Sequence, residues 1–175
     1  MKLAIRSIQI VTGLMLIFLS IGMFVPEFAF STTVTSKSSL DSLASTLEQP
    51  ENVIRWSTGY SNVVDSSEQN NELDGVDKSD SSAFESSSGE KANILHLKWL
   101  SESNLSASVK AKHFSSNAKV YLIDANGKTE LQFEHHIIPH GVFWKSVLFF
   151  QKSSIQEKIE DSIENLFSDK AVQST

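Results

Sequence analysis

The chain contains no cysteine, which excludes disulfide bonds, thiol catalysis, thiolate metal sites and iron–sulfur clusters. It also lacks the common catalytic signatures: there is no Gly-x-Ser-x-Gly, no His-Glu-x-x-His and no glycine-rich phosphate loop. Basic residues are outnumbered by acidic ones, 15 against 21, which argues against a surface for nucleic acid or anionic lipid. These absences leave no catalytic residue, metal site or cofactor to predict.

Long apolar runs are also scarce, with one exception near the start of the chain. From Ile8 to Val25 the sequence is uncharged over about 18 residues, close to the minimum for a helix that spans a roughly 30 Å hydrocarbon layer. Lys2 and Arg6 precede this run and Glu27 follows it, so the positive-inside bias places the N-terminus in the cytosol. We therefore predict a single-pass membrane protein with residues 1–26 as its anchor and the remaining chain on the outer side, periplasmic or extracellular.

The alternative is a cleaved secretory signal, which would make the domain a secreted protein. Such signals have an apolar core of about 7 to 15 residues followed by small residues at the cleavage site. Ser20 and Gly22 would supply a small pair, but cleavage there would leave Met23, Phe24 and Val25 as an apolar new terminus. We favour the retained anchor for this reason.

Residues 27–170 are predicted to form one domain, followed by a tail at 171–175. Aromatic and β-branched residues from Phe28 to Ser36 predict a strand that follows the anchor almost directly. Apolar residues between Leu40 and Leu47 recur at helical spacing and predict a short helix. A second short helix is predicted to begin at Pro50 and to stop at Gly59.

The segment from 65 to 90 is rich in Ser, Asp, Glu, Asn and Gly, so we predict a polar, poorly ordered loop. Short strands are predicted at 60–64 and 83–85. Asp74, Asp77 and Asp80 lie close together, but their spacing matches no EF-hand loop, which needs ligands at alternate positions, a central Gly and a terminal Glu. A solvated loop is the simpler interpretation of these carboxylates.

Beyond Lys91 the apolar period becomes two, which indicates an antiparallel sheet with one solvated face. Asn126-Gly127 predicts a tight hairpin between the last two strands, because a type I′ turn needs positive φ at both central residues. The predicted strands are 92–100, 105–114, 118–124 and 129–138.

The C-terminal segment predicts an amphipathic helix from Ile155 to Phe167, with apolar residues every three or four positions. Ahead of it, a dense apolar group from Val142 to Phe150 either extends this helix or forms a lip at the edge of the domain. Core packing is the simpler interpretation of this group, and a membrane-facing or ligand-gating surface is the alternative.

Several segments carry a resemblance to a known family: Thr33–Leu40 with Leu47–Ser57, which includes Trp56, then Gly127–Glu134 and Ile155–Phe167. They are similar to the opening strand and helix pair, the penultimate strand and the closing helix of the SRPBCC or START-like superfamily. This superfamily includes the polyketide cyclase/dehydrase group and the pollen-allergen-like lipid binders. Some bacterial members resemble this chain further, because they have one N-terminal transmembrane helix that ends in a proline, as at Pro26 here.

The resemblance implies an α+β helix-grip fold: a curved antiparallel sheet wrapped around a long C-terminal helix, with two short helices after the first strand. Here one transmembrane helix would precede the domain. The resemblance also implies a deep apolar cavity between sheet and helix, which members use for lipids, sterols, plant hormones or polyketide intermediates. The chain departs from the family between Asp65 and Glu90, where the family has clear strands. Fold alone does not imply chemistry, so no catalytic role is carried over.

Alternation along the predicted strands selects the side chains that would line this cavity, with the closing helix opposite them. Leu131, Phe133 and His135 share a face, so His135 is predicted to be the polar group in an apolar wall, where it would orient a ligand hydroxyl or carbonyl. His136 would leave the opposite face and would not share a metal ion or proton with it. The predicted cavity residues are Ala107, Val109, Ala111, Leu131, Phe133, His135, Ile159 and Ile163.

Three functional hypotheses follow from these patterns and from the resemblance. The leading one is a membrane-anchored protein that binds a hydrophobic small molecule or lipid without transforming it. The second is an enzyme of the cyclase or dehydratase type that uses His135, Glu134 or Tyr121. The third is an interaction module whose groove receives a protein segment.

Overall fold

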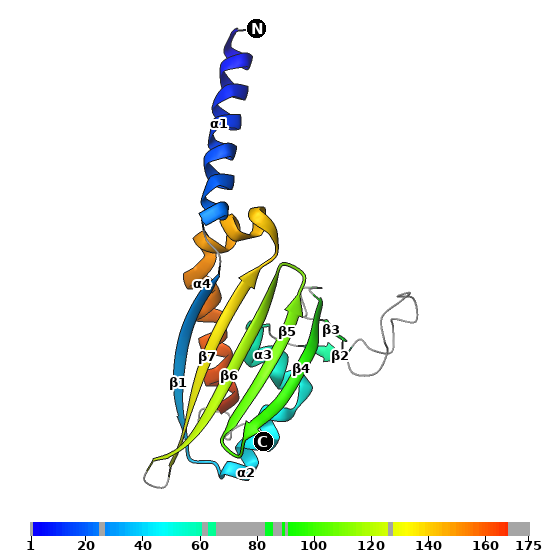
Figure 1. Ribbon diagram of the computed structural model, residues 1–175, viewed down its shortest axis with the longest axis vertical. Helices are drawn as coiled ribbons and strands as arrows, with labels where there is room; N and C mark the ends of the chain where they lie inside the picture. The colour runs from blue at the N-terminus through cyan, green and yellow to red at the C-terminus, as the bar shows by residue number, and fades with distance from the viewer. Residues whose placement is uncertain are drawn as a thin grey trace.

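The computed structural model describes residues 2–24, 27–60, 63–65, 83–85, 89, 91–125 and 128–167 (Figure 1). The chain begins with a helix, α1, that extends away from a domain built of one sheet and three further helices. The elements are α1 (Lys2–Phe24), β1 (Phe28–Ser36), α2 (Leu40–Glu48), α3 (Pro50–Thr58), β2 (Val64–Asp65), β3 (Ala83–Glu85), β4 (Lys91–Ser101), β5 (Asn104–Ala111), β6 (Phe114–Ala125), β7 (Lys128–Pro139) and α4 (Gly141–Phe167).

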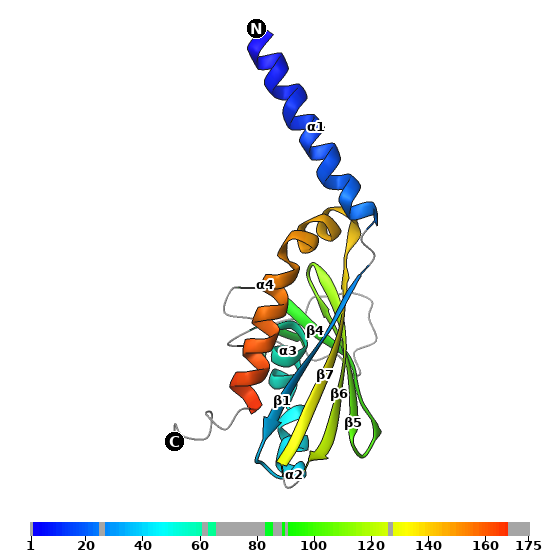
Figure 2. The same cartoon turned by 90° about the vertical axis from the view of Figure 1, so that its left-hand side faces the viewer.

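The strands pair in the order β1-β7-β6-β5-β4-β3-β2, and every pair is antiparallel. β1 therefore lies at one edge, beside the last strand of the sheet, with a register that runs from Phe28 opposite Ile137 to Ser36 opposite Thr129. Figure 2 shows the curved sheet with α3 and α4 on its concave side. This is the predicted α+β helix-grip fold, with its two short helices after the first strand.

α2 and α3 form a compact pair against one end of the sheet. Pro50 occupies the first turn of α3, where its missing N–H costs no helical hydrogen bond, and Gly59 ends the helix with φ of 72°. Trp56 of α3 is fully buried, and its indole N–H donates to the carbonyl oxygen of Leu47 at 3.3 Å. α3 contacts β4, β5 and β6 on their inner face.

α4 is one continuous helix, so the apolar group from Val142 to Phe150 extends it rather than forming a separate lip. Its first turns lie under the end of α1, and the rest runs along the sheet beside β1 and β7 (Figure 2). At its C-terminal half α4 also packs closely on α3, because a Cβ atom at Gly59 would lie 3.0 Å from Cγ1 of Ile159. The buried residues of α4 are Ser146, Leu148, Ile159, Ile163 and Phe167.

The predicted boundary between β5 and β6 was wrong. We expected strands at 105–114 and 118–124, whereas β5 ends at Ala111 and β6 begins at Phe114. The connection is Lys112-His113, which contains no glycine, proline, asparagine or aspartate to mark a turn. The short strand predicted at 60–64 is likewise displaced, since β2 comprises only Val64 and Asp65.

Some predicted features lie outside the described residues. They are the proline after the anchor, the Asn126-Gly127 turn, the aspartates between 74 and 80, most of the polar segment and the tail at 171–175. The strands on either side of the predicted turn pair as far as Ala125 and Lys128. The short strand predicted at 83–85 is confirmed as β3.

Candidate functional site

His135 lies near the middle of β7 and faces the layer between the sheet and the helices, where its side chain is fully buried. The registers of three strand pairs place it in one row across the sheet. Phe30 of β1 is its neighbour on one side and Ala118 of β6 on the other, with Ala107 of β5 beyond Ala118. This row therefore combines one aromatic ring, one imidazole and two small side chains.

Aromatic rings flank the imidazole of His135. Its centroid lies 4.8 Å from that of Phe30 and 6.2 Å from that of Phe133, and the interplanar angles are 20° and 5°. Phe133 in turn contacts Trp56 of α3 and Phe167 of α4, at centroid distances of 5.9 Å and 5.6 Å. Aromatic rings therefore lie beside the imidazole, whose polar atoms are the two nitrogens of its ring.

Neither ring nitrogen of His135 has a hydrogen-bond partner among the residues that the structure describes. A buried polar group left without a partner costs about 1 to 3 kcal/mol, and most buried polar groups in proteins are paired with protein or ordered water. A neutral imidazole offers one N–H donor and one nitrogen acceptor. The site thus presents a donor and an acceptor that the described part of the chain does not satisfy.

Burial lowers the pKa of His135 from 6.5 to about 4, because desolvation disfavours the charged imidazolium. The ring is therefore neutral at pH 7. A neutral donor and acceptor pair suits a ligand hydroxyl or carbonyl group better than a carboxylate or phosphate, which would require a cationic partner.

Small side chains lie beside His135 on the neighbouring strands. Ala118 and Ala107 are both buried and oppose each other across β6 and β5. Two residues before Ala118 on the same face of β6, Ser116 donates a hydrogen bond to the carbonyl oxygen of Ser57 at 2.6 Å, which joins the end of α3 to the sheet. The two positions that follow His135 across the sheet therefore carry only a methyl group each.

All of the predicted cavity residues are buried in this one layer. Three lie on β5, three on β7 and two on α4: Ala107, Val109, Ala111, Leu131, Phe133, His135, Ile159 and Ile163. The helix in contact with β5 is α3, whereas α4 contacts β1, β7 and α3. α3 therefore covers part of the sheet that we had expected the closing helix to cover alone. That these residues line a ligand cavity stays a prediction.

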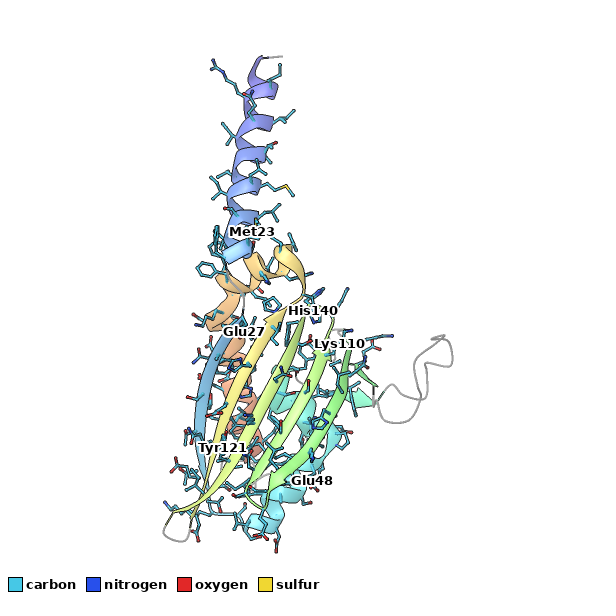
Figure 3. The ribbon with its side chains drawn as sticks, in the orientation of Figure 1. Met23, Glu27, Glu48, Lys110, Tyr121 and His140 are labelled. Carbon is cyan, nitrogen blue, oxygen red and sulfur yellow. The ribbon has the colours of Figure 1, made fainter. Side chains whose placement is uncertain are left out.

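Of the three groups in the enzyme hypothesis, Tyr121 and Glu134 lie together, but both are separated from His135. Tyr121 and Glu134 lie on the outer face of the sheet, where the phenol donates to Oε2 of Glu134 at 3.1 Å (Figure 3). Burial first, and then the hydrogen bond and negative charge of Glu134, raise the pKa of Tyr121. His135 lies on the inner face, so the sheet separates it from both groups.

The other histidines have separate surroundings. Nδ1 of His136 lies 3.8 Å from Oε1 of Glu27 on the outer face, and Nε2 of His140 lies 2.8 Å from Oγ of Ser115. The ring of His113 stacks on Trp144. Within the described residues no three His, Cys, Asp or Glu side chains lie close enough together to hold a metal ion.

Two direct neighbours of His135, Ala118 and Phe30, were not predicted from the sequence. Ala118 could have been predicted, because it shares a face with Val120 and Leu122 along one strand. Phe30 could not, because its contact depends on the pairing of β1 with β7, two strands that are far apart in the chain.

Solved structures of the same architecture resemble this chain at low sequence identity. Protein CV1439 from Chromobacterium violaceum is 10% identical with a TM-score of 0.50, over 79% of this chain and 94% of that chain. A START superfamily protein from Mycobacterium smegmatis is 14% identical with a TM-score of 0.47, over 79% and 98%. CalU16 from Micromonospora echinospora is 14% identical with a TM-score of 0.46, over 84% and 80%.

At 10% identity the similarity to CV1439 extends to the fold alone. No protein-family model matches the sequence, and neither does a curated protein. The helix-grip fold is therefore established by the architecture, and a function has to be argued from the site.

Proposed function

We propose that this protein is a membrane-anchored binding protein for a hydrophobic small molecule or lipid that carries a hydroxyl or carbonyl group. The ligand lies between the sheet and the helices, with its polar group at His135. The observation that supports this proposal is the fully buried imidazole whose two nitrogens have no partner within the described part of the chain.

The surroundings of His135 select the chemistry of the ligand. The buried layer is apolar, and none of the buried residues that the structure describes is an aspartate, glutamate, lysine or arginine. Burying an unpaired charge there would be costly, whereas burying apolar surface contributes about 25 cal/mol per Å². A neutral, largely hydrocarbon molecule with one hydrogen-bonding group therefore fits the site best.

Substitution of Ala118 should block ligand binding without unfolding the domain. In Ala118→Leu the larger side chain occupies the volume beside His135, so it displaces a ligand there. The full chain in detergent is irradiated with a fatty alcohol that carries a diazirine in its chain, and the cross-linked peptides are identified by mass spectrometry. We expect labelling of β5, β6 and β7 to fall about tenfold in this variant, which corresponds to about 1.4 kcal/mol.

Ala92→Leu is the matched control, because Ala92 is as buried as Ala118 and lies on the inner face of β4, where it pairs with Ala111 outside the row of His135. Labelling of α1 by the same probe serves as an internal standard for non-specific partition. A parent protein whose strands are not labelled, or equal labelling in the two variants, would refute a ligand at His135.

The membrane anchor is supported by α1. Its segment Ile5–Phe24 has 20 residues and a mean hydropathy of 2.0, and only 6% of this stretch is buried against the rest of the protein. Twenty helical residues extend for about 30 Å, which matches the hydrocarbon thickness of a bilayer. The first charged residue after this segment is Glu27.

A topology measurement tests the anchor. A reporter enzyme fused after Thr175 should be active only on the outer side of the membrane, and the mature protein should retain Met1, because Lys2 and Arg6 hold the N-terminus in the cytosol. Sequencing of the mature N-terminus shows whether Met1 is retained, and fractionation of the cells shows whether the protein stays with the membrane. A mature chain that starts at or after Met23 would show a cleaved signal and a secreted domain.

A further inference from the structure

α1 and the first turns of α4 pack with almost no space between their backbones. Ser146 of α4 donates a hydrogen bond to the carbonyl oxygen of Phe18 at 2.7 Å, in addition to one within its own helix to Val142 at 3.2 Å. Gly22 permits this approach, because a Cβ atom there would lie 2.1 Å from the carbonyl oxygen of Val142. The two helices are thus joined at the last turns of α1.

Aromatic side chains reinforce this junction. The ring of Phe18 lies 6.0 Å from that of Phe143 in an edge-on arrangement, and 6.0 Å from that of Phe150 with an interplanar angle of 9°. Phe18 is therefore held between two rings of α4, which fixes the height of α4 along α1.

If α1 spans the membrane, the position of α4 along α1 places the start of α4 within the membrane. Ser146 is level with Phe18, six residues before the end of α1 at Phe24, which corresponds to roughly 9 Å along the helix. Val142 is level with Gly22, roughly 3 Å from that end. Helices that lie in the membrane interface are buried by about 5 to 10 Å, which agrees with these depths.

The surface at this end of the domain is apolar. We use the term juxtamembrane patch for six exposed residues of α1 and α4, with the exposed fraction of each in parentheses. They are Met23 (71%), Phe24 (85%), Val142 (43%), Phe143 (50%), Phe149 (49%) and Phe150 (63%). Met23 marks this end in Figure 3, and Glu48 marks the opposite end of the domain. A contiguous apolar surface of this kind usually indicates a partner or a membrane.

The polar residues around the patch suit a lipid surface. Between Gly141 and Gln156 the charged residues are Lys145 and Lys152, with no carboxylate, although the whole chain has a net charge of −6. Trp144 lies in the same turns, stacked on His113. Phenylalanine, tryptophan and lysine together are the composition of helices that lie at the boundary between headgroups and acyl chains.

We propose that the first turns of α4, from Gly141 to about Lys152, are an interfacial membrane helix whose juxtamembrane patch is embedded in the outer leaflet beside α1. This inference rests on the proposed membrane anchor. It adds a second membrane contact beside α1, and two contacts fix the orientation of the domain on the bilayer. The occupant of the patch is the acyl region of the bilayer, because α1 continues the same apolar surface.

Spin labels at single cysteines test the proposal, because the parent chain has no cysteine to remove. The full-length variants Phe150→Cys, Leu14→Cys and Ile123→Cys are labelled and reconstituted in vesicles of phosphatidylcholine and phosphatidylglycerol. The accessibility of each label to oxygen, which concentrates in acyl chains, is compared with its accessibility to a water-soluble nickel chelate. Leu14 reports on α1, and Ile123 is an exposed apolar residue of β6 that serves as the matched control.

We expect the labels at 150 and 14 to favour oxygen several-fold over the nickel chelate, and the label at 123 to favour the chelate. A label at 150 that behaves like the one at 123, with 14 still in lipid, would overturn the interfacial helix and leave the anchor intact. A label at 14 in water would instead overturn the anchor and the interfacial helix with it. Spectral broadening at 150 that increases with the protein-to-lipid ratio would show that a second copy covers the patch, which also contradicts the proposal.

Discussion

Trp56→Ala should lower the free energy of unfolding by about 3 to 5 kcal/mol, the cost of deleting a large core side chain. The indole of Trp56 is fully buried and packs on Phe133 at a centroid distance of 5.9 Å. Its N–H donates to the carbonyl oxygen of Leu47, so the substitution leaves a cavity and also removes one of the hydrogen bonds that join α2 to α3. The effect should be among the largest of any single substitution in the domain.

Thermal melts of the full chain in one detergent measure this effect. For a domain of this size 1 kcal/mol shifts Tm by about 2 to 4 °C, so the midpoint should fall by roughly 10 °C. Trp99→Ala is the control, because Trp99 is only partly buried and its indole bonds to the exposed carboxylate of Glu48. If Trp56→Ala melts like the parent, the helix pair does not form part of the core.

His135→Leu should make the protein more stable and at the same time abolish ligand binding. Leucine fills the site without a polar atom, which removes the cost of about 1 to 3 kcal/mol for a buried imidazole that has no partner among the described residues. Labelling of the strands by the diazirine alcohol should fall as in Ala118→Leu. A gain in stability combined with a loss of binding is typical of a site retained for function, and a purely structural histidine would give a loss of stability.

The same substitution should change how stability depends on pH. In the unfolded chain His135 takes up a proton near its usual pKa of 6.5, whereas in the folded protein it stays neutral down to about 4. Between these values the unfolded state binds more protons, so the folded state loses stability as the pH falls, by about 3 kcal/mol in total. The advantage of His135→Leu over the parent should therefore grow by about that amount from pH 7 to pH 4.

Carboxylates titrate in the same range, so the quantity to measure is the difference between the two proteins. His136→Leu is the matched control, since this neighbouring histidine has 54% of its side chain exposed and lies on the outer face. The difference between His135→Leu and His136→Leu at each pH isolates the contribution of the buried ring. A constant difference for His135→Leu would show that the imidazole is solvated or already paired in the folded state.

Local patterns were sufficient to predict most elements of the fold. Alternation indicated β4 and β7 to within a residue, and Pro50 with Gly59 bounded α3 correctly. The patterns failed where a boundary has no local signal: Lys112-His113 turns the chain without a turn-forming residue, and the buried Ser116 interrupts the apolar alternation of β6. The hydroxyl of Ser116 is satisfied by α3, a partner that no local pattern indicates.

The same distinction applies to the site. Alternation along β7 placed His135 among apolar residues, because the period of a strand is a local property. That it has no partner in the described part of the chain is not local: it depends on Phe30 and Ala118, which the pairing of three strands brings beside it. The proposed role of the exposed aromatic residues of α4 was likewise not predictable from local sequence, because it depends on their contact with α1, which lies far away in the chain.

The position of β1 has a consequence for how the chain is made. This strand is synthesised before the rest of the sheet, yet its partner in the sheet is β7, which is synthesised last. Until β7 has emerged, both edges of β1 carry unpaired N–H and C=O groups, and such edges promote association with other chains. Pairing of strands so distant in sequence is also slow. A nascent chain that is halted before β7 would therefore expose an adhesive strand, and chaperones are expected to be needed during that interval.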